Sequence, residues 1–188
     1  MGLIVKSKYI LKVGSLKVGL IPTTFTNTNL KDIYDKLKLI DKEIDISIID
    51  YRLILSIKHI IGILRIIDEK KKRNNTSSIK NIEIEILMRF CYTDQISEAL
   101  KINFGDPFNR NFIVIVISNH DRIFCEVERC VLDKGKLNEE ILEKDTSNKE
   151  YIIDKFFKKH IKEWDSSIFK DERKFLEFVV ERGAIALK

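Results

Sequence analysis

The sequence predicts one α/β (α+β) domain over residues 1–188, with helices packed on a mixed β-sheet that starts with an N-terminal hairpin. The chain has 188 residues, of which 44% are hydrophobic, and this is enough to bury one core. Apolar residues recur with the period of two of strands in some segments and with the helical spacing of three and four in others. The longest apolar run, FIVIVI at 112–117, predicts a central strand buried on both faces.

A hairpin, a helix and a strand are predicted for the first 50 residues. The apolar runs LIV and YILKV precede a Gly-Ser turn at 14–15, and LKVGLI follows as the second arm. The polar loop TTFTNTN ends at Asn29, a residue type that caps helices, and helical spacing extends over 30–40. Isoleucines alternate with polar residues over 44–48, which predicts a half-buried strand.

The longest predicted helix begins at Leu53 and carries a strip of basic residues. Its apolar residues fall on one helical stripe, which the charged tail DEKKKRNN follows. Lys58, Arg65 and Lys72 repeat every seven residues on the opposite side. The tract 70–80 lacks apolar periodicity, so we expect it to form the helix end and an exposed loop.

Strands and helices continue to alternate in the second half. Isoleucines alternate with glutamates over 82–90, which predicts a second internal strand. Thr93 or Asp94 then caps a helix that ends at Gly105, with its inward side formed by Ile96, Ala99, Leu100 and Asn103.

The last third of the chain is predicted to be mainly helical. Residues 123–131 form a short strand or helix, and helical spacing returns over 152–164 and 171–181. The tail RGAIALK is expected to return as a short strand. No internal repeat or linker divides the domain.

Charge is distributed unevenly along the chain. Residues 1–80 hold 16 Lys or Arg against 8 Asp or Glu, whereas residues 81–188 hold 18 against 21. This asymmetry is typical of a protein that meets polyphosphate on one face, although a lysine-rich solvated surface has the same composition.

Motifs for catalysis, metals and membranes are missing from the sequence. It contains no GxGxxG, GxxxxGK[ST] or GxSxG motif, and its three cysteines and three histidines lack zinc-site spacing. We therefore expect no catalytic residue, no metal and no cofactor. The apolar runs are too short to span a membrane, and MGLIVKSKYI lacks the features of a signal peptide. A cytoplasmic protein with reduced cysteines is expected.

Two long segments carry a recognisable pattern, SIIDYRLILSIKHIIGILRIIDEKKK at 47–72 and IEIEILMRFCYTDQISEALKINFG at 82–105. They resemble the PRPK-binding (CGI-type) family, the small kinase-binding subunit of the KEOPS (EKC) complex. NKEYIIDKFFKKH and FLEFVVERGAIALK resemble the later helices of that family. The sequence departs from the family pattern at Ile60, where leucine is usual, and at Thr93 and Asp94, where a Gly-containing turn is common. The positions that correspond to the family's two motifs are Lys58, His59, Ile60, Gln95, Ile96, Ala99, Phe104 and Gly105.

The resemblance implies a non-enzymatic subunit of the machinery that makes N6-threonylcarbamoyladenosine beside the anticodon of tRNAs. Such a subunit binds the small atypical kinase of the complex directly and the other KEOPS subunits indirectly. In archaeal members it helps to capture tRNA through its 3′ end.

Two surfaces are expected to carry this function. The helix over 171–181 is apolar on more than one side, and we expect its second side to be buried against a partner protein. We therefore expect a kinase-docking patch formed by Phe104, Phe178 and Ile185. The residues expected to contact tRNA phosphates are Lys58, His59, Arg65, Lys70, Lys71, Lys72 and Arg73.

Two alternatives remain open at this stage. A stand-alone RNA-binding module would use Tyr51 and Tyr92 to stack bases. A small metal-dependent nuclease would use Asp50, Glu83 and Glu85, although carboxylates that alternate with isoleucines are also typical of the solvated face of a strand.

Overall fold

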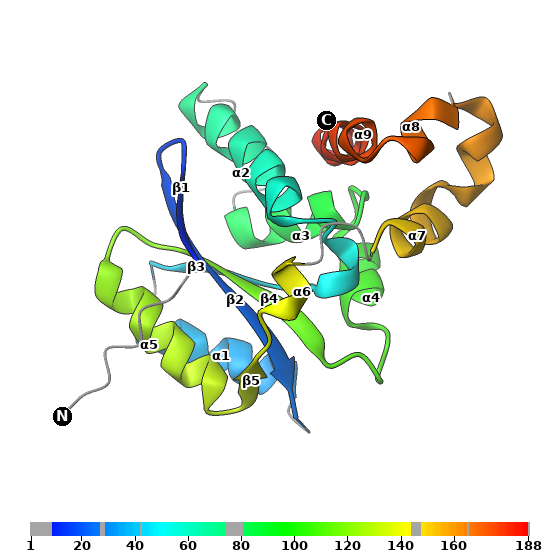
Figure 1. Ribbon diagram of the computed structural model, residues 1–188. Coiled ribbons are helices and arrows are strands. Elements are labelled where there is room, and N and C mark those ends of the chain that lie inside the picture. Colours follow the sequence, from blue (N-terminus) through cyan, green and yellow to red (C-terminus); the bar gives the residue numbers. More distant parts are fainter. Residues whose placement is uncertain are drawn as a thin grey trace.

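Antiparallel strands form the sheet on which the helices of the computed structural model pack (Figure 1). The structure describes residues 9–26, 29–41, 43–73, 81–143, 148–164 and 166–187. Within these ranges the strand order is β1-β2-β4-β3, with β5 also paired to β2, and the predicted α+β class is confirmed. Each described strand pair is antiparallel, whereas a mixed sheet was expected. The strands are β1 (Ile10–Val13), β2 (Leu16–Phe25), β3 (Asp45–Asp50), β4 (Asn111–Ile117) and β5 (Gly135–Leu137).

The predicted N-terminal hairpin is present, and its second strand pairs with three others. β1 pairs with the start of β2 around a turn in which Gly14 has a φ of 60°. β2 continues past Pro22 to Phe25, so the first part of the expected loop TTFTNTN belongs to the strand. The apolar run LIV at 3–5 lies outside the described residues.

Helices cover both faces of the sheet. Alternate residues of β4 enter two hydrophobic clusters, with Ile113 and Ile115 in one and Val114 and Val116 in the other. The prediction of a central strand buried on both faces is therefore confirmed. One face is covered by α1 (Leu30–Ile40) and α5 (Asp121–Leu132), and the other by α2 (Ile57–Lys72), α3 (Ile82–Phe90) and α4 (Ile96–Phe104) (Figure 1).

Capping side chains define where the first helices begin. Asn29 caps α1, as predicted, because its side-chain oxygen accepts a hydrogen bond from the Lys31 amide at 3.0 Å. α2 begins at Ile57 rather than Leu53, because Ser56 caps it and Tyr51–Leu53 forms a separate 3₁₀ turn. The segment 123–131 is helical and lies within α5.

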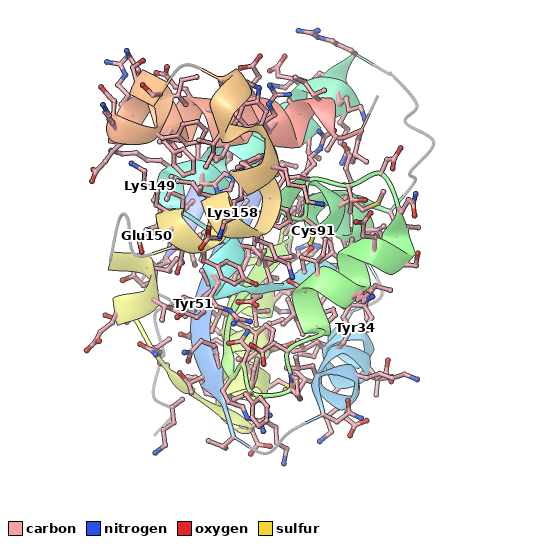
Figure 2. All side chains as sticks on the ribbon, turned by 90° about the vertical axis from the view of Figure 1, so that its right-hand side faces the viewer. Tyr34, Tyr51, Cys91, Lys149, Glu150 and Lys158 are labelled. Carbon is pink, nitrogen blue, oxygen red and sulfur yellow. The ribbon has the colours of Figure 1, made fainter. Side chains whose placement is uncertain are left out.

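The C-terminal segments are helical and extend beyond the sheet. Figure 2 shows them at the end of the molecule that carries Lys149 and Lys158, with Tyr34 of α1 toward the other end. The helices predicted over 152–164 and 171–181 are confirmed, although the first is divided into short segments. The elements are α6 (Glu140–Glu143), α7 (Lys149–Ile152), the π-helical η2 (Ile153–Phe157), the 3₁₀-helical η3 (Lys158–Glu163), α8 (Ser166–Lys170) and α9 (Glu172–Ile185).

α9 packs closely on α2, and two glycines allow the approach. A Cβ atom on Gly62 would lie 2.6 Å from Cγ2 of Val180, and one on Gly183 would lie 2.6 Å from Cδ1 of Ile63. α9 remains helical through Gly183 to Ile185, so the strand expected in RGAIALK is wrong.

The predicted strand over 82–90 is also wrong, because these residues form helix α3. Asn81 caps it by accepting hydrogen bonds from the amides of Glu83 at 2.9 Å and Ile84 at 3.3 Å. The strand prediction assumed that the glutamates face water. Glu83 and Glu85 are instead buried, so the alternation of isoleucine and glutamate does not separate a solvent-exposed face from a buried face.

Glu83 joins α3 to α1 and to the edge of the sheet. Its carboxylate accepts hydrogen bonds from the Tyr34 hydroxyl at 2.6 Å and from the Ile46 amide at 2.6 Å. It also forms an ion pair with Lys38. Burial has the largest effect in raising the pKa of Tyr34, and the Glu83 carboxylate raises it further. The tyrosine therefore stays a neutral donor at physiological pH.

Glu85 pairs with Arg89, which holds α3 against the end of α9. Nε of Arg89, a fully buried side chain, donates to Oε1 of Glu85 at 3.0 Å. Nη1 of Arg89 donates to the carbonyls of Gly183 at 2.8 Å and Ala184 at 3.2 Å. A cation at the C-terminal end of a helix is favourable, and here it also satisfies terminal carbonyls.

Asp68 of α2 fixes the turn of the N-terminal hairpin. Its carboxylate accepts hydrogen bonds from the Ser15 amide at 3.1 Å and from the Ser15 hydroxyl. Lys72 lies one helical turn away, with its Nζ 2.7 Å from the carboxylate. These donors hold the pKa of Asp68 below its ordinary value, and Lys72 has the largest effect.

Replacing Glu83 with Ala is expected to lower the free energy of unfolding by about 3 kcal/mol, because Tyr34, Lys38 and the Ile46 amide lose their acceptor. The matched control, Glu126→Ala on the exposed side of α5, is expected to change it by less than about 0.5 kcal/mol. Urea unfolding measures both values. Equal losses in the two variants would contradict the assigned role of Glu83.

The Asp68→Asn variant is expected to be less stable than the parent at pH 7 but not at low pH. A carboxyl with a lowered folded-state pKa stabilises the fold above the unfolded-state value, near 4, and this stabilisation is lost as pH falls through the folded-state pKa. Thermal unfolding from pH 2 to 7 checks this. A stability difference that does not shrink toward acid pH would show that the charge of Asp68 is not involved.

Candidate functional site

Basic side chains line the exposed side of α2, as the seven-residue repeat predicts. Lys58 and Arg65 are exposed at the side opposite the buried stripe, and Lys71 and Arg73 are exposed at the C-terminal end of the helix. None of these four forms an ion pair with another described residue. Lys58 and Arg65 lie about two turns apart, so the helix presents separated cations along one side.

Two further residues of the predicted tRNA-binding set are already paired within the chain. Nζ of Lys72 lies 2.7 Å from Asp68 and 3.2 Å from Glu69. Lys70 is half-buried, and its Nζ lies 3.4 Å from Glu85. These pairs reduce the charge that either lysine presents to an outside anion. The part of the predicted tract at 74–80 lies outside the described residues.

His59 does not belong to this basic surface, and its predicted contact with tRNA phosphate is wrong. The side chain is fully buried, with its ring against Phe90 at a centroid distance of 4.9 Å. Its Nδ1 accepts a hydrogen bond from the Leu55 amide at 3.2 Å. Burial lowers the pKa of His59 to about 3, so the ring is neutral at physiological pH and cannot reach a phosphate.

Phe178 is also buried, so the expectation that it lies on an exposed side of α9 is wrong. Its side chain is 7% exposed. The rings of Phe157 and Trp164 lie 5.0 Å and 4.9 Å from it, and Phe169 lies at 5.9 Å. The second apolar side of α9 is therefore covered within the chain, by segments that precede it.

Phe104, in contrast, belongs to an exposed apolar stripe on α4. Ile96, Leu100 and Phe104 are 47%, 42% and 39% exposed and recur every four residues. Phe108, in the following loop, is also exposed. The predicted inward position of Ile96 and Leu100 is wrong for both residues. The other predicted docking residue, Ile185, is 42% exposed on the last turn of α9.

The first turn of α4 explains why this stripe faces outward. The helix begins at Ile96, with Gln95 rather than Thr93 or Asp94 at the cap position. The Thr93 hydroxyl accepts a hydrogen bond from the Gln95 amide at 3.2 Å and donates to Glu98 at 2.6 Å. Ala99 and Asn103 are the buried residues of the helix, and the i, i+4, i+8 spacing of the exposed residues is the signal that sequence analysis missed.

An apolar pocket opens beside this stripe, along the free edge of β3. Its volume is about 630 Å³. Side chains from α1, α3 and α4 form its walls, and they include Leu30, Tyr34, Ile84, Leu87, Leu100 and Phe104. A cavity of this size and character is typical of ligand sites and of pockets for anchoring side chains.

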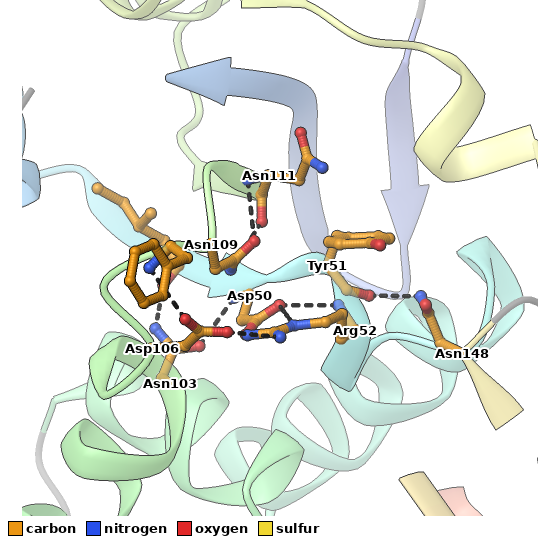
Figure 3. A network of polar contacts seen from close by, with 10 residues as sticks. Asp50, Tyr51, Arg52, Asn103, Asp106, Asn109, Asn111 and Asn148 are labelled. Carbon is orange, nitrogen blue, oxygen red and sulfur yellow. Dashed lines mark hydrogen bonds and ion pairs between the residues drawn. The ribbon is translucent and has the colours of Figure 1, made fainter. Parts of the chain in front are cut away.

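A polar network borders the pocket at the end of β3 (Figure 3). Arg52 donates from Nε to Asp50 at 3.1 Å and from Nη2 to the other oxygen of Asp50 at 2.7 Å. Its Nη1 donates to Asp106 at 2.8 Å. Asn103 bridges Ile48 and Asp50 through their main-chain groups, at 2.8 Å each. The network fixes the loop after α4 against the strand.

The carboxylates of the nuclease alternative do not form a metal site. Asp50, Glu83 and Glu85 each pair with a different basic side chain. Across the described ranges, no three His, Cys, Asp or Glu side chains are grouped so that they can hold a metal ion. All three cysteines are free thiols. No helix in the described part of the chain is long and apolar enough to cross a membrane.

The two tyrosines considered for base stacking pack against the chain itself. The ring of Tyr92 lies 4.8 Å from that of Phe156 and 5.1 Å from that of Phe157. Tyr51 is half-buried, and its carbonyl accepts a hydrogen bond from Asn148 at 2.7 Å (Figure 3). Neither ring is an exposed stacking platform.

Two comparisons with known proteins bear on the family of this chain. No curated protein sequence matches it at a significant level. A family model described as Kinase binding protein CGI-121 matches residues 25–188, which is most of the chain. The family is a non-catalytic kinase-binding subunit, which confirms both the resemblance and the expectation that the chain is not an enzyme. The chain belongs to the CGI-121 kinase-binding protein family.

Proposed function

We propose that the chain is the accessory subunit of the KEOPS (EKC) complex that binds its small atypical kinase and helps to recruit tRNA for N6-threonylcarbamoyladenosine modification next to the anticodon. The family match over residues 25–188 is the observation that carries this proposal. Its finer parts are supported by two exposed surfaces of opposite chemistry, one cationic and one apolar.

The cationic surface of α2 is the proposed tRNA contact. Lys58, Arg65, Lys71 and Arg73 are exposed, and no ion pair with a described residue neutralises them. Phosphate contacts made by such residues release counterions, which gives affinity without sequence preference. Lys70 and Lys72 contribute less, because acidic neighbours already hold them.

The apolar stripe of α4 is the proposed kinase contact, in place of the patch centred on Phe178. Ile96, Leu100 and Phe104 form a row of exposed side chains, and water contact with such a row is unfavourable. Leu39 of α1 is more exposed, at 84%, but it is not part of a comparable row. A partner that covers the stripe would gain affinity from several adjacent side chains.

The tRNA contact is tested by neutralising Lys58 and Arg65 together. The Lys58→Gln, Arg65→Gln variant is expected to bind tRNA more weakly, and its plot of log affinity against log salt should be shallower by about 1.5 to 2, because each lost phosphate contact removes nearly one counterion. Filter binding over a range of salt concentrations gives both values.

The chain offers a matched control for this test. Arg122 and Arg129 of α5 are exposed and also seven residues apart, but α5 covers the other face of the sheet. The Arg122→Gln, Arg129→Gln variant is expected to keep the parental salt dependence. If both variants weaken tRNA binding equally, the effect is one of net charge and α2 is not the contact.

The kinase contact is tested by placing charges on the α4 stripe. The Ile96→Glu, Leu100→Glu variant, co-expressed with the small kinase of the same organism, is expected to lose about thirtyfold or more in affinity, equivalent to about 2 kcal/mol. Calorimetry on the purified proteins measures this. Leu39→Glu, the same kind of substitution at an isolated exposed leucine, should leave the affinity unchanged. Parental binding by the α4 variant, with an unaltered melting curve, would place the kinase elsewhere.

A further inference from the structure

The outer edge of β3 is blocked at both ends and open in the middle. β3 is the terminal strand of the order β1-β2-β4-β3, and its register with β4 is continuous from Asp45 to Asp50. In such a pair, alternate residues direct their main-chain groups away from the neighbouring strand. The Ile46 and Asp50 amides identify the outward set, since Glu83 and Asn103 accept hydrogen bonds from them at 2.6 Å and 2.8 Å.

This arrangement leaves one acceptor and one donor side by side. Asn103 also donates to the Ile48 carbonyl at 2.8 Å. The remaining outward groups between the two blocking side chains are the Ile46 carbonyl and the Ile48 amide, for which the described residues supply no partner. In a parallel ladder, a single residue of an added strand donates to the first and accepts from the second.

The pocket of about 630 Å³ runs along this edge and has apolar walls on both sides of the strand plane. Leu30 and Tyr34 of α1 stand on one side, and Ile84 and Leu87 of α3 stand on the other. An added strand directs successive side chains to opposite faces, so both walls would be used. A flat nucleobase would lie in one plane only. Its ring nitrogens that do not bond to Ile46 or Ile48 would face aliphatic walls without hydrogen-bond partners.

The rim of the pocket adds a preference in charge. Lys31 of α1 and Arg110 of the loop before β4 line the pocket toward the carboxyl end of β3, and both are exposed. Neither forms an ion pair with another described residue. Acidic residues at the C-terminal end of a segment that enters parallel to β3 would therefore meet free cations.

We propose that β3 and this pocket bind an extended segment of a partner protein, which pairs in parallel with Ile46 and Ile48. Such a segment places aliphatic side chains on both sides of β3, and its acidic C-terminal end lies at Lys31 and Arg110. This is recognition by strand addition, limited to a short stretch because Glu83 and Asn103 occupy the flanking positions of the edge.

The probe is a panel of capped pentapeptides with Ser at the first position, Val, Leu, Ile or Phe at the three central positions and Asp at the last position. Binding by at least one member is expected to slow hydrogen exchange of the Ile48 amide, measured by NMR on the full chain. The same peptide with an N-methylated central residue lacks the donor for the Ile46 carbonyl and should bind at least tenfold more weakly.

A charge swap provides a second readout on exposed residues. The Lys31→Glu, Arg110→Glu variant is expected to bind the Asp-ended peptide about tenfold more weakly and to recover affinity for a Lys-ended peptide. The proposal is wrong if no panel member protects the Ile48 amide, or if N-methylation has no effect. It is also wrong if adenosine monophosphate protects that amide and the peptides do not, since the pocket then takes a nucleotide.

Discussion

Two buried glutamates in α3 determine how the layers of this molecule are joined. Glu83 binds Tyr34 and Lys38 of α1 and the Ile46 amide of β3, whereas Glu85 binds Arg89, which in turn holds the last turn of α9. An unpaired charge at a buried carboxylate is costly, so these two glutamates need both sets of partners in place together. The position of α3 therefore fixes the sheet edge on one side and the C-terminal helix on the other.

This constraint separates the surfaces available to partners. The charges that support the fold are satisfied within the chain, and Lys70 and Lys72 are partly drawn into those pairs. The exposed cations of α2 form the proposed contact for tRNA, and the apolar stripe of α4 forms the proposed contact for the kinase. Phosphate binding weakens with salt and apolar docking does not, so the two contacts respond to different conditions.

Much of the fold was predictable from the sequence because its signals are local. The hairpin, the cap at Asn29 and the central strand follow from turn residues, capping chemistry and apolar runs. The helix α3 was not predictable, because a pattern of alternating isoleucine and glutamate does not reveal that distant Lys38 and nearby Arg89 neutralise the carboxylates. The predictions that His59 and Phe178 are exposed were wrong for a related reason. Their burial depends on Phe90, Phe157 and Trp164, whose positions only the tertiary structure supplies.

The central claim is that kinase and tRNA occupy separate surfaces of one non-catalytic subunit. The most direct measurement is the tRNA affinity of the purified chain as the kinase is titrated to saturation, followed by fluorescence anisotropy of labelled tRNA at constant salt. Separate surfaces predict that tRNA affinity stays constant or rises when the kinase is bound. A tRNA affinity that falls in proportion to the kinase concentration would show competition for one surface and would contradict the account.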